Sequence, residues 1–185
     1  MLLVAWSAHA RDKDGAFAVK GVGSLTCREF VTQHGQRGAR LSNYVGWIDG
    51  FMTGINQHTP ETFDLAPWQG GSLLAYAVAG YCRRAPEESF YKAVRGLAQT
   101  LYTNRLTDAS DVLVASTADA QVFVYATVLT DVRSALIEMG HLAQPIDGAF
   151  DNETAAALRR FQRSKGLPES GLPDQQTLVE IYRQP

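Results

Sequence analysis

The chain has 185 residues, a formal net charge of -2, 45% hydrophobic residues and 19% charged residues. This length and composition are typical of a folded protein with one large core or two small ones. The nearly balanced charge leaves no basic stripe to neutralise phosphates, so the composition argues against nucleic acid as a partner.

The first ten residues, MLLVAWSAHA, are an apolar run that ends with Ala8 and Ala10 in an A-x-A arrangement. This pattern is typical of the end of a secretory signal, and we expect export with cleavage after Ala10. The alternative is an ordinary apolar N-terminus. We treat 1–23 as a signal-like and leader segment. No other segment has the ~18 apolar residues that span a bilayer, so a membrane-spanning protein is not expected.

The sequence contains two cysteines, Cys27 and Cys82. They form a disulfide if the protein is exported, and otherwise they are two buried thiols. They form neither a CxxC pair nor a zinc-ligand cluster, and the four histidines are scattered. We therefore predict no metal site and no cofactor.

Residues 24–104 are expected to form a small helical domain. A short helix is predicted around 27–30, a second over 41–57 and a third over 68–84. A fourth is predicted to begin at 86–88, where a proline and two acidic residues suit a first helical turn. Cys27 would then tie the first helix to the end of the third.

Two features of this domain predict packing. Gly46, Gly50 and Gly54 recur every four residues, which favours the close approach of another backbone along that face. An aromatic core is expected from Trp47, Phe51, Tyr76, Tyr81, Phe90 and Tyr91.

Residues 105–127 are rich in Thr, Ser, Asp and Ala and are predicted to be a linker, with a short extended piece at 112–114. The following VFVYATV, at 122–128, suits a strand or a helix equally well. Beyond it, 128–185 is expected to form three short helices with glycine stops. The overall prediction is an all-α protein, in which a linker joins a disulfide-bonded helical domain to a three-helix domain.

A spacing pattern repeats within the C-terminal unit. Gly148, Asp151, Thr154 and Leu158 recur 23 residues later as Gly171, Asp174, Thr177 and Ile181. In each copy a glycine turn precedes an aspartate suited to cap a helix and a threonine suited to its third position. We predict that Asp147, Gly148, Asp151, Thr154, Gly166, Gly171, Asp174 and Thr177 are helix caps and turns, because one protein seldom needs the same reactive pair twice.

The motifs VRSALIEMG, IDGAF, ETAAALRRFQRSKGLP and SGLPDQQTL, within about 128–185, resemble the three-helix peptidoglycan-binding domain of cell-wall hydrolases. Two positions depart from that pattern: Asp151 replaces a glycine, and Arg133 replaces a glutamine. The resemblance implies peptidoglycan as the partner, whose stem peptides carry carboxylates and amides. We therefore predict a binding surface from Arg159, Phe161, Gln162, Arg163 and Lys165.

The segments TCREFV, YVGWIDGFMTGIN and YCRRAPEESFYKAVRGLAQTL, over 24–103, resemble small disulfide-bonded helical proteins of the Gram-negative periplasm. These are the HdeA-like acid-stress chaperones and the immunity proteins against secreted amidases. The matching positions are Cys27, Trp47, Gly50, Phe51, Gly54, Asn56, Tyr81, Cys82 and Pro86. The resemblance implies a periplasmic location and a role in protein interaction.

The leading hypothesis is a non-catalytic periplasmic protein that binds peptidoglycan and presents an N-terminal interaction domain, with an envelope protein as a further partner. The alternative is an inhibitor, immunity-type or acid-stress chaperone protein whose C-terminal unit binds another protein. An enzyme would need a site such as Asp49, His58, Glu61 and Asp64, which are near one another in sequence. We interpret that stretch as an ordinary polar loop and predict no catalytic residue.

Overall fold

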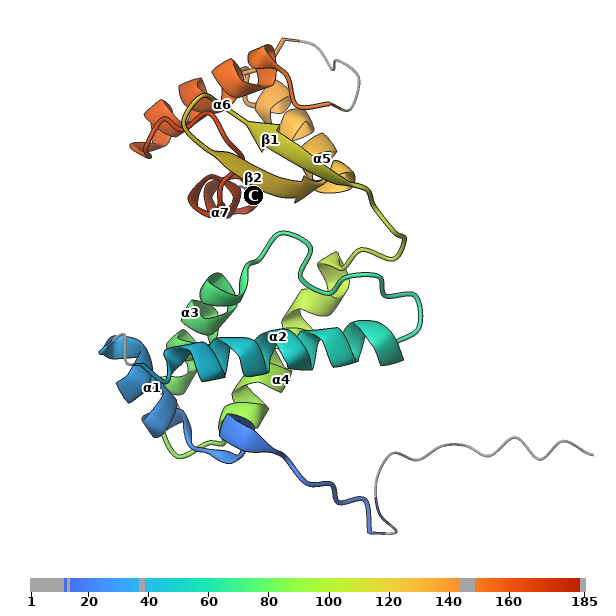
Figure 1. Cartoon of the computed structure of the whole chain (residues 1–185), viewed down its shortest axis with the longest axis vertical. Coiled ribbons are helices and arrows are strands. Elements are labelled where there is room, and N and C mark those ends of the chain that lie inside the picture. The colour runs from blue at the N-terminus through green and yellow to red at the C-terminus, as the bar shows by residue number, and fades with distance from the viewer. Residues whose placement is uncertain (1–11, 13, 37–38, 144–148, 184–185) are drawn as a thin grey trace, which may run out of the picture.

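The computed structural model describes residues 12, 14–36, 39–143 and 149–183. Over these residues the chain is mostly helical, as predicted, and it forms two units (Figure 1). The N-terminal unit consists of η1 (Gly21–Ser24), α1 (Cys27–Gly35), α2 (Leu41–His58), α3 (Gly71–Cys82), α4 (Phe90–Leu101) and η2 (Tyr102–Asn104). The C-terminal unit consists of β1 (Val112–Ser116), β2 (Gln121–Tyr125), α5 (Ala126–Glu138), α6 (Asn152–Lys165) and α7 (Gln175–Tyr182).

A disulfide joins Cys27, at the start of α1, to Cys82, at the end of α3. Both cysteines are fully buried in the core of the N-terminal unit. The core beside them is aromatic: the Phe30 ring centroid lies 4.7 Å from that of Phe90 and 5.0 Å from that of Tyr44. The disulfide is thus confirmed, and it links helices whose apolar faces already pack together.

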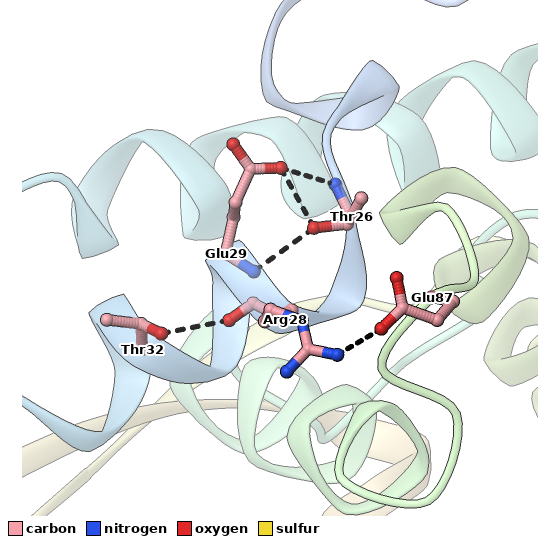
Figure 2. A network of polar contacts seen from close by, with 5 residues as sticks. All are labelled: Thr26, Arg28, Glu29, Thr32 and Glu87. Atoms are coloured by element: carbon pink, nitrogen blue, oxygen red, sulfur yellow. Dashed lines mark hydrogen bonds and ion pairs between the residues drawn. The ribbon is translucent and has the colours of Figure 1, made fainter.

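The start of α1 is held by polar contacts that Figure 2 shows at close range. Thr26 accepts a hydrogen bond from the backbone N–H of Glu29, whose carboxylate accepts in return from the Thr26 N–H and hydroxyl. This is a capping box, which satisfies amide groups that the first helical turn leaves unpaired. Arg28 forms an exposed ion pair with Glu87, from the segment before α4.

That segment corrects one prediction. Residues 86–88 form a turn and not the first turn of a helix, because their carbonyl groups accept hydrogen bonds from α1: the Cys27 N–H donates to Glu88 O at 2.8 Å. Helix α4 begins at Phe90, with Ser89 as its cap. The turn therefore fixes the start of α1 against the start of α4.

The expected packing of another backbone on Gly46, Gly50 and Gly54 is also wrong. A Cβ atom added at any of them would meet nothing within 4 Å in the described structure. The close approach occurs instead at Gly71, where a Cβ would lie 2.7 Å from side-chain atoms of both Asp49 and Val45 on α2. The glycine face of α2 is left open.

Two of the six aromatic residues expected in the core lie on the surface: Tyr76 is 62% exposed and Tyr81 is 41% exposed. Part of the predicted leader packs inward instead. A Cβ added at the buried Gly23 would lie 2.2 Å from the Trp47 ring, and the Trp47 indole N–H donates to Lys20 O at 2.9 Å. The folded unit therefore begins before residue 24.

The predicted linker contains an antiparallel β-hairpin, in which Val114 pairs with Phe123 and Leu113 with Val124. Ala115 and Val124 are buried in the core of the C-terminal unit, whereas Val114 and Phe123 are 50% and 69% exposed. This alternation is that of a strand with one face buried. The prediction of a plain linker is corrected, and VFVYATV divides into a strand up to Tyr125 and a helix from Ala126.

The two units touch through aromatic and amide groups. The Trp68 ring, from the loop before α3, stacks on the Tyr182 ring of α7, with centroids 4.7 Å apart and planes 7° from parallel. Gln175 of α7 accepts from the Gly70 N–H at 2.6 Å and donates to Trp68 O at 3.0 Å. Nearby, the Tyr125 hydroxyl donates to Asp64 at 3.1 Å.

Reduction of the disulfide is expected to destabilise the N-terminal unit. A crosslink over 55 residues restricts the unfolded chain, which corresponds to about 4 kcal/mol in the chain-entropy account. Urea unfolding with and without reductant, followed by circular dichroism, measures the difference. The Cys27→Ala/Cys82→Ala variant is the control, since reductant should not change its midpoint. Equal midpoints for the wild type in both conditions would contradict the prediction.

Candidate functional site

Both helices of the repeated pattern begin at an aspartate, as predicted. Asp151 accepts a hydrogen bond from the Thr154 N–H at 2.7 Å, and Asp174 accepts from the Thr177 N–H at 3.0 Å. Each helix thereby gains a carboxylate at its positive end. Gly166 ends α6 in the left-handed conformation, with φ of 67°. Asp147 and Gly148, predicted as part of the same pattern, lie outside the described residues.

Gln162 of α6 is fully buried and organises the turn that leads into α7. Its Oε1 accepts from the Gly171 N–H at 2.9 Å. The two N–H groups of its Nε2 are shared among three acceptors, the hydroxyls of Ser170 and Thr177, at 2.9 and 2.8 Å, and Leu172 O at 3.1 Å. A buried amide is stable only when its polar atoms are satisfied in this way. Gln162 thus ties the middle of α6 to the start of α7.

Phe161 is also fully buried and belongs to the apolar core with Leu136, Leu158 and Ile181. The expectation that Phe161 and Gln162 contribute to a binding surface is therefore corrected. Neither side chain reaches the solvent, because one fills the core and the other holds the turn. Of the five predicted surface residues, the basic ones remain.

The three predicted basic residues differ in their exposure to solvent and in whether an acidic side chain already binds them. Arg163 pairs with Glu169 through two bonds, at 2.9 and 2.6 Å. This pairing lowers the pKa of Glu169. Arg159 is half-buried over the turn at Gly171, where an added Cβ would lie 2.9 Å from its guanidinium. Lys165 is exposed, with its ammonium 5.8 Å from the Phe161 ring centroid. We refer to Arg159, Arg163 and Lys165 together as the α6 basic face: Arg159 and Arg163 are one helical turn apart, and Lys165 lies on another side of the helix, beside Phe161.

Arg133, one of the two departures from the family pattern, is 4% exposed on α5. Its guanidinium donates to Ala149 O at 3.3 Å, close to the start of α6. The side chain and backbone N–H of Thr154 lower the pKa of Asp151, and the charge of Arg133 lowers it further. The two departures from the pattern, Arg133 and Asp151, therefore lie close enough to interact electrostatically.

Two members of the hypothetical catalytic group, Asp64 and Asp49, make structural contacts. The Asp64 carboxylate accepts hydrogen bonds from the Asn56 side chain, the Ala66 N–H and the Tyr125 hydroxyl, so it holds the loop in place. Asp49 lies instead against the start of α3 at Gly71. Among the described residues, no group of three or more His, Cys, Asp or Glu side chains could hold a metal ion.

The comparison with known families bears on the C-terminal unit. Residues 128–181 match the family described as "Putative peptidoglycan binding domain". This match supports peptidoglycan binding by that unit. No curated protein and no solved structure matches the chain. The HdeA-like resemblance of the N-terminal unit stays a prediction. Across the described residues, no helix combines the length and apolar character needed to cross a membrane.

The sequence could not show the Gln162 network, because Ser170, Leu172 and Thr177 meet the amide only after the chain turns back. Gln175, Trp68 and Tyr182 were missed for the same reason: their contacts join segments more than a hundred residues apart.

Replacing Gln162 should destabilise the C-terminal unit strongly. Gln162→Leu keeps the volume but leaves the Gly171 N–H and the Leu172 carbonyl without their buried partner, at a cost of about 2–4 kcal/mol. Urea unfolding measures the loss. Arg163→Gln is the matched control, because its exposed pair with Glu169 is worth under about 1 kcal/mol. Similar effects of the two substitutions would contradict the role assigned to Gln162.

The cap at Asp151 should make stability depend on pH. The pKa of Asp151 is lower in the folded chain than in the unfolded chain. The ionised carboxylate therefore contributes fully to the free energy of unfolding above the unfolded pKa of about 3.9, and this contribution is lost as the pH falls through the folded-state pKa. Asp151→Asn keeps a capping oxygen but does not titrate. We expect the wild type to lose more stability than this variant between about pH 5 and 2. Parallel pH profiles in urea unfolding would contradict this expectation.

Proposed function

We propose that this chain is a non-catalytic periplasmic protein of the cell envelope that binds peptidoglycan through 128–185 and presents its N-terminal helical unit to a protein partner. The observation that carries the proposal is the match of residues 128–181 to a family described as peptidoglycan binding. The N-terminal unit is then held at the cell wall by the C-terminal unit.

The α6 basic face is the proposed contact for the anionic part of the polymer. Lys165 is exposed and Arg159 lies beside the turn at Gly171, so both cations can approach a carboxylate. Arg163 would first have to leave Glu169, to which it is bound through two bonds. Guanidinium and ammonium groups bind carboxylates through charge-assisted hydrogen bonds. Arg159 and Lys165 are therefore the first residues to test.

An interaction role for the N-terminal unit is supported by an open apolar surface along α2 and α4. Two adjoining cavities of about 460 and 390 Å³ share Phe51 and Tyr91, and Trp47 also lines the larger one. Exposed apolar hollows of this kind mark protein contact sites more often than scattered apolar residues do. The open face at Gly46 and Gly50 borders the same surface.

A periplasmic location is supported by the disulfide between Cys27 and Cys82. Disulfides of this kind persist in oxidising compartments and are rare in the cytosol. The signal-like segment up to Ala10 lies outside the described residues, and cleavage there stays a prediction. Peptidoglycan and the disulfide point to the same compartment.

Neutralising the α6 basic face should weaken binding to insoluble peptidoglycan. In a sedimentation assay, the full chain is expected to pellet with purified sacculi. The Arg159→Gln/Lys165→Gln variant should pellet less, by roughly 10-fold in affinity, because it loses two charge-assisted contacts of about 0.5–1 kcal/mol each after solvent screening.

The matched control is Lys92→Gln/Arg95→Gln, which removes two exposed positive charges from α4 of the other unit. This variant should pellet like the wild type. Equal losses in both variants would indicate attraction governed by net charge alone, and a wild-type chain that stays in solution would overturn the proposed function.

A further inference from the structure

A cavity of about 390 Å³ lies between the two units. Its wall combines Trp68, Gln69 and Asn104 of the N-terminal unit with Val128, Asp131 and Tyr182 of the C-terminal unit. This volume falls in the range of about 300–1,000 Å³ that is usual for small-molecule sites. Neither unit contains the cavity by itself.

The aromatic part of the wall is held in place before any ligand arrives. Trp68 and Tyr182 stack face to face, and Gln175, on the same helix as Tyr182, bonds to the loop that carries Trp68, at the Gly70 N–H and at Trp68 O. Tyr182 is bound in turn to Asp131, to which its hydroxyl donates at 3.3 Å. A site whose groups are already positioned loses little freedom on binding.

The polar groups of the wall favour an uncharged, hydrogen-bonding ligand. The wall includes Asp131, Asn104 and Gln69, and the Gln69 side-chain oxygen accepts a hydrogen bond from the Trp68 backbone N–H at 3.3 Å. Arg105 also borders the cavity, but its guanidinium donates to Glu61 O, to the Thr62 hydroxyl and to Tyr102 O. The cavity is therefore bordered by one positive charge, on Arg105, and one negative charge, on Asp131, and this balance favours an uncharged ligand.

Partial burial raises the pKa of Asp131, whereas the hydrogen bond from Tyr182 lowers it. Its carboxylate is therefore placed where water solvates it incompletely. A ligand hydroxyl or amide N–H would replace part of that solvation, and such donors are abundant on sugars that carry acetamido groups. The Trp68 and Tyr182 rings each use one face in their mutual stack, so the apolar C–H groups of one sugar ring would meet the remaining ring surface while its polar edge meets Asp131 and Asn104.

We propose that the cavity between the units binds a neutral acetamido sugar, so that the protein contacts the glycan of peptidoglycan at this cavity and the stem peptides at the α6 basic face. This inference rests on the proposed function and assigns the two chemical components of the polymer to two different sites. The cavity requires both units, so it gives the N-terminal unit a direct part in binding.

The test uses the full chain and the N-acetylglucosamine trimer, which has the sugar chemistry without stem peptides. In a titration followed by ¹⁵N NMR, saturable shifts are expected at the indole N–H of Trp68 and at the side-chain amides of Gln69 and Asn104. Shifts that map to another surface, or none at millimolar trimer, would overturn the assignment of the cavity.

Two substitutions refine the test. Asn104→Ala and Asp131→Ala should each weaken the affinity for the trimer roughly 5- to 10-fold, which corresponds to one lost hydrogen bond. Asp119→Ala, an exposed carboxylate in the turn of the hairpin, is the matched control and should have no effect. Unchanged affinity in both cavity variants would overturn the proposal.

The trimer titration and the sacculus assay can fail separately. Sacculi that bind the protein while the trimer does not would overturn the cavity proposal and leave peptidoglycan binding intact. A trimer that binds at the cavity while sacculi do not would keep a sugar site and overturn the function proposed for the whole chain.

Discussion

The buried amide of Gln162 is the contact on which the C-terminal unit depends. It satisfies the Gly171 N–H, the Leu172 carbonyl and the hydroxyl groups of Ser170 and Thr177 from a single side chain. Without it, a turn that lies against the core would keep unpaired polar atoms, which costs more than a missing contact between apolar groups. This turn brings Gly171 beneath Arg159 and leads directly into α7. The far end of α7 contacts the N-terminal unit.

Helix α7 connects this internal order to the arrangement of the whole molecule. Gln175 lies in its first turn and bonds to the loop at Trp68 and Gly70, while Tyr182 at its end stacks on the Trp68 ring. A helix of eight residues therefore contacts the neighbouring unit at both ends. Trp68 also packs against the apolar core of the C-terminal unit, so ring packing and hydrogen bonds together hold the two units in one arrangement.

The sequence placed the basic residues of the candidate site on one helix but did not reveal which of their neighbours are buried. Arg159, Arg163 and Lys165 could be placed on one stretch of helix from their spacing alone, and the family resemblance pointed to an anionic polymer. The same resemblance could not separate Phe161 and Gln162 from their exposed neighbours, because adjacent positions on a helix can face the core or the solvent. The inter-unit cavity was invisible in the sequence, since its wall joins Trp68 and Asn104 to Asp131 and Tyr182 across two units.

The sequence by itself determined the local features of this protein: the aspartate caps at Asp151 and Asp174, the glycine stop at Gly166 and the predominance of helix. Each follows from the geometry of a few consecutive residues. Only the tertiary structure decided that Cys27 and Cys82 are bonded, that residues 112–125 form a hairpin, and that the glycine face of α2 stays open. Those outcomes depend on which surfaces meet after the chain folds back, and side-chain packing between distant segments has no signature in any short stretch of sequence.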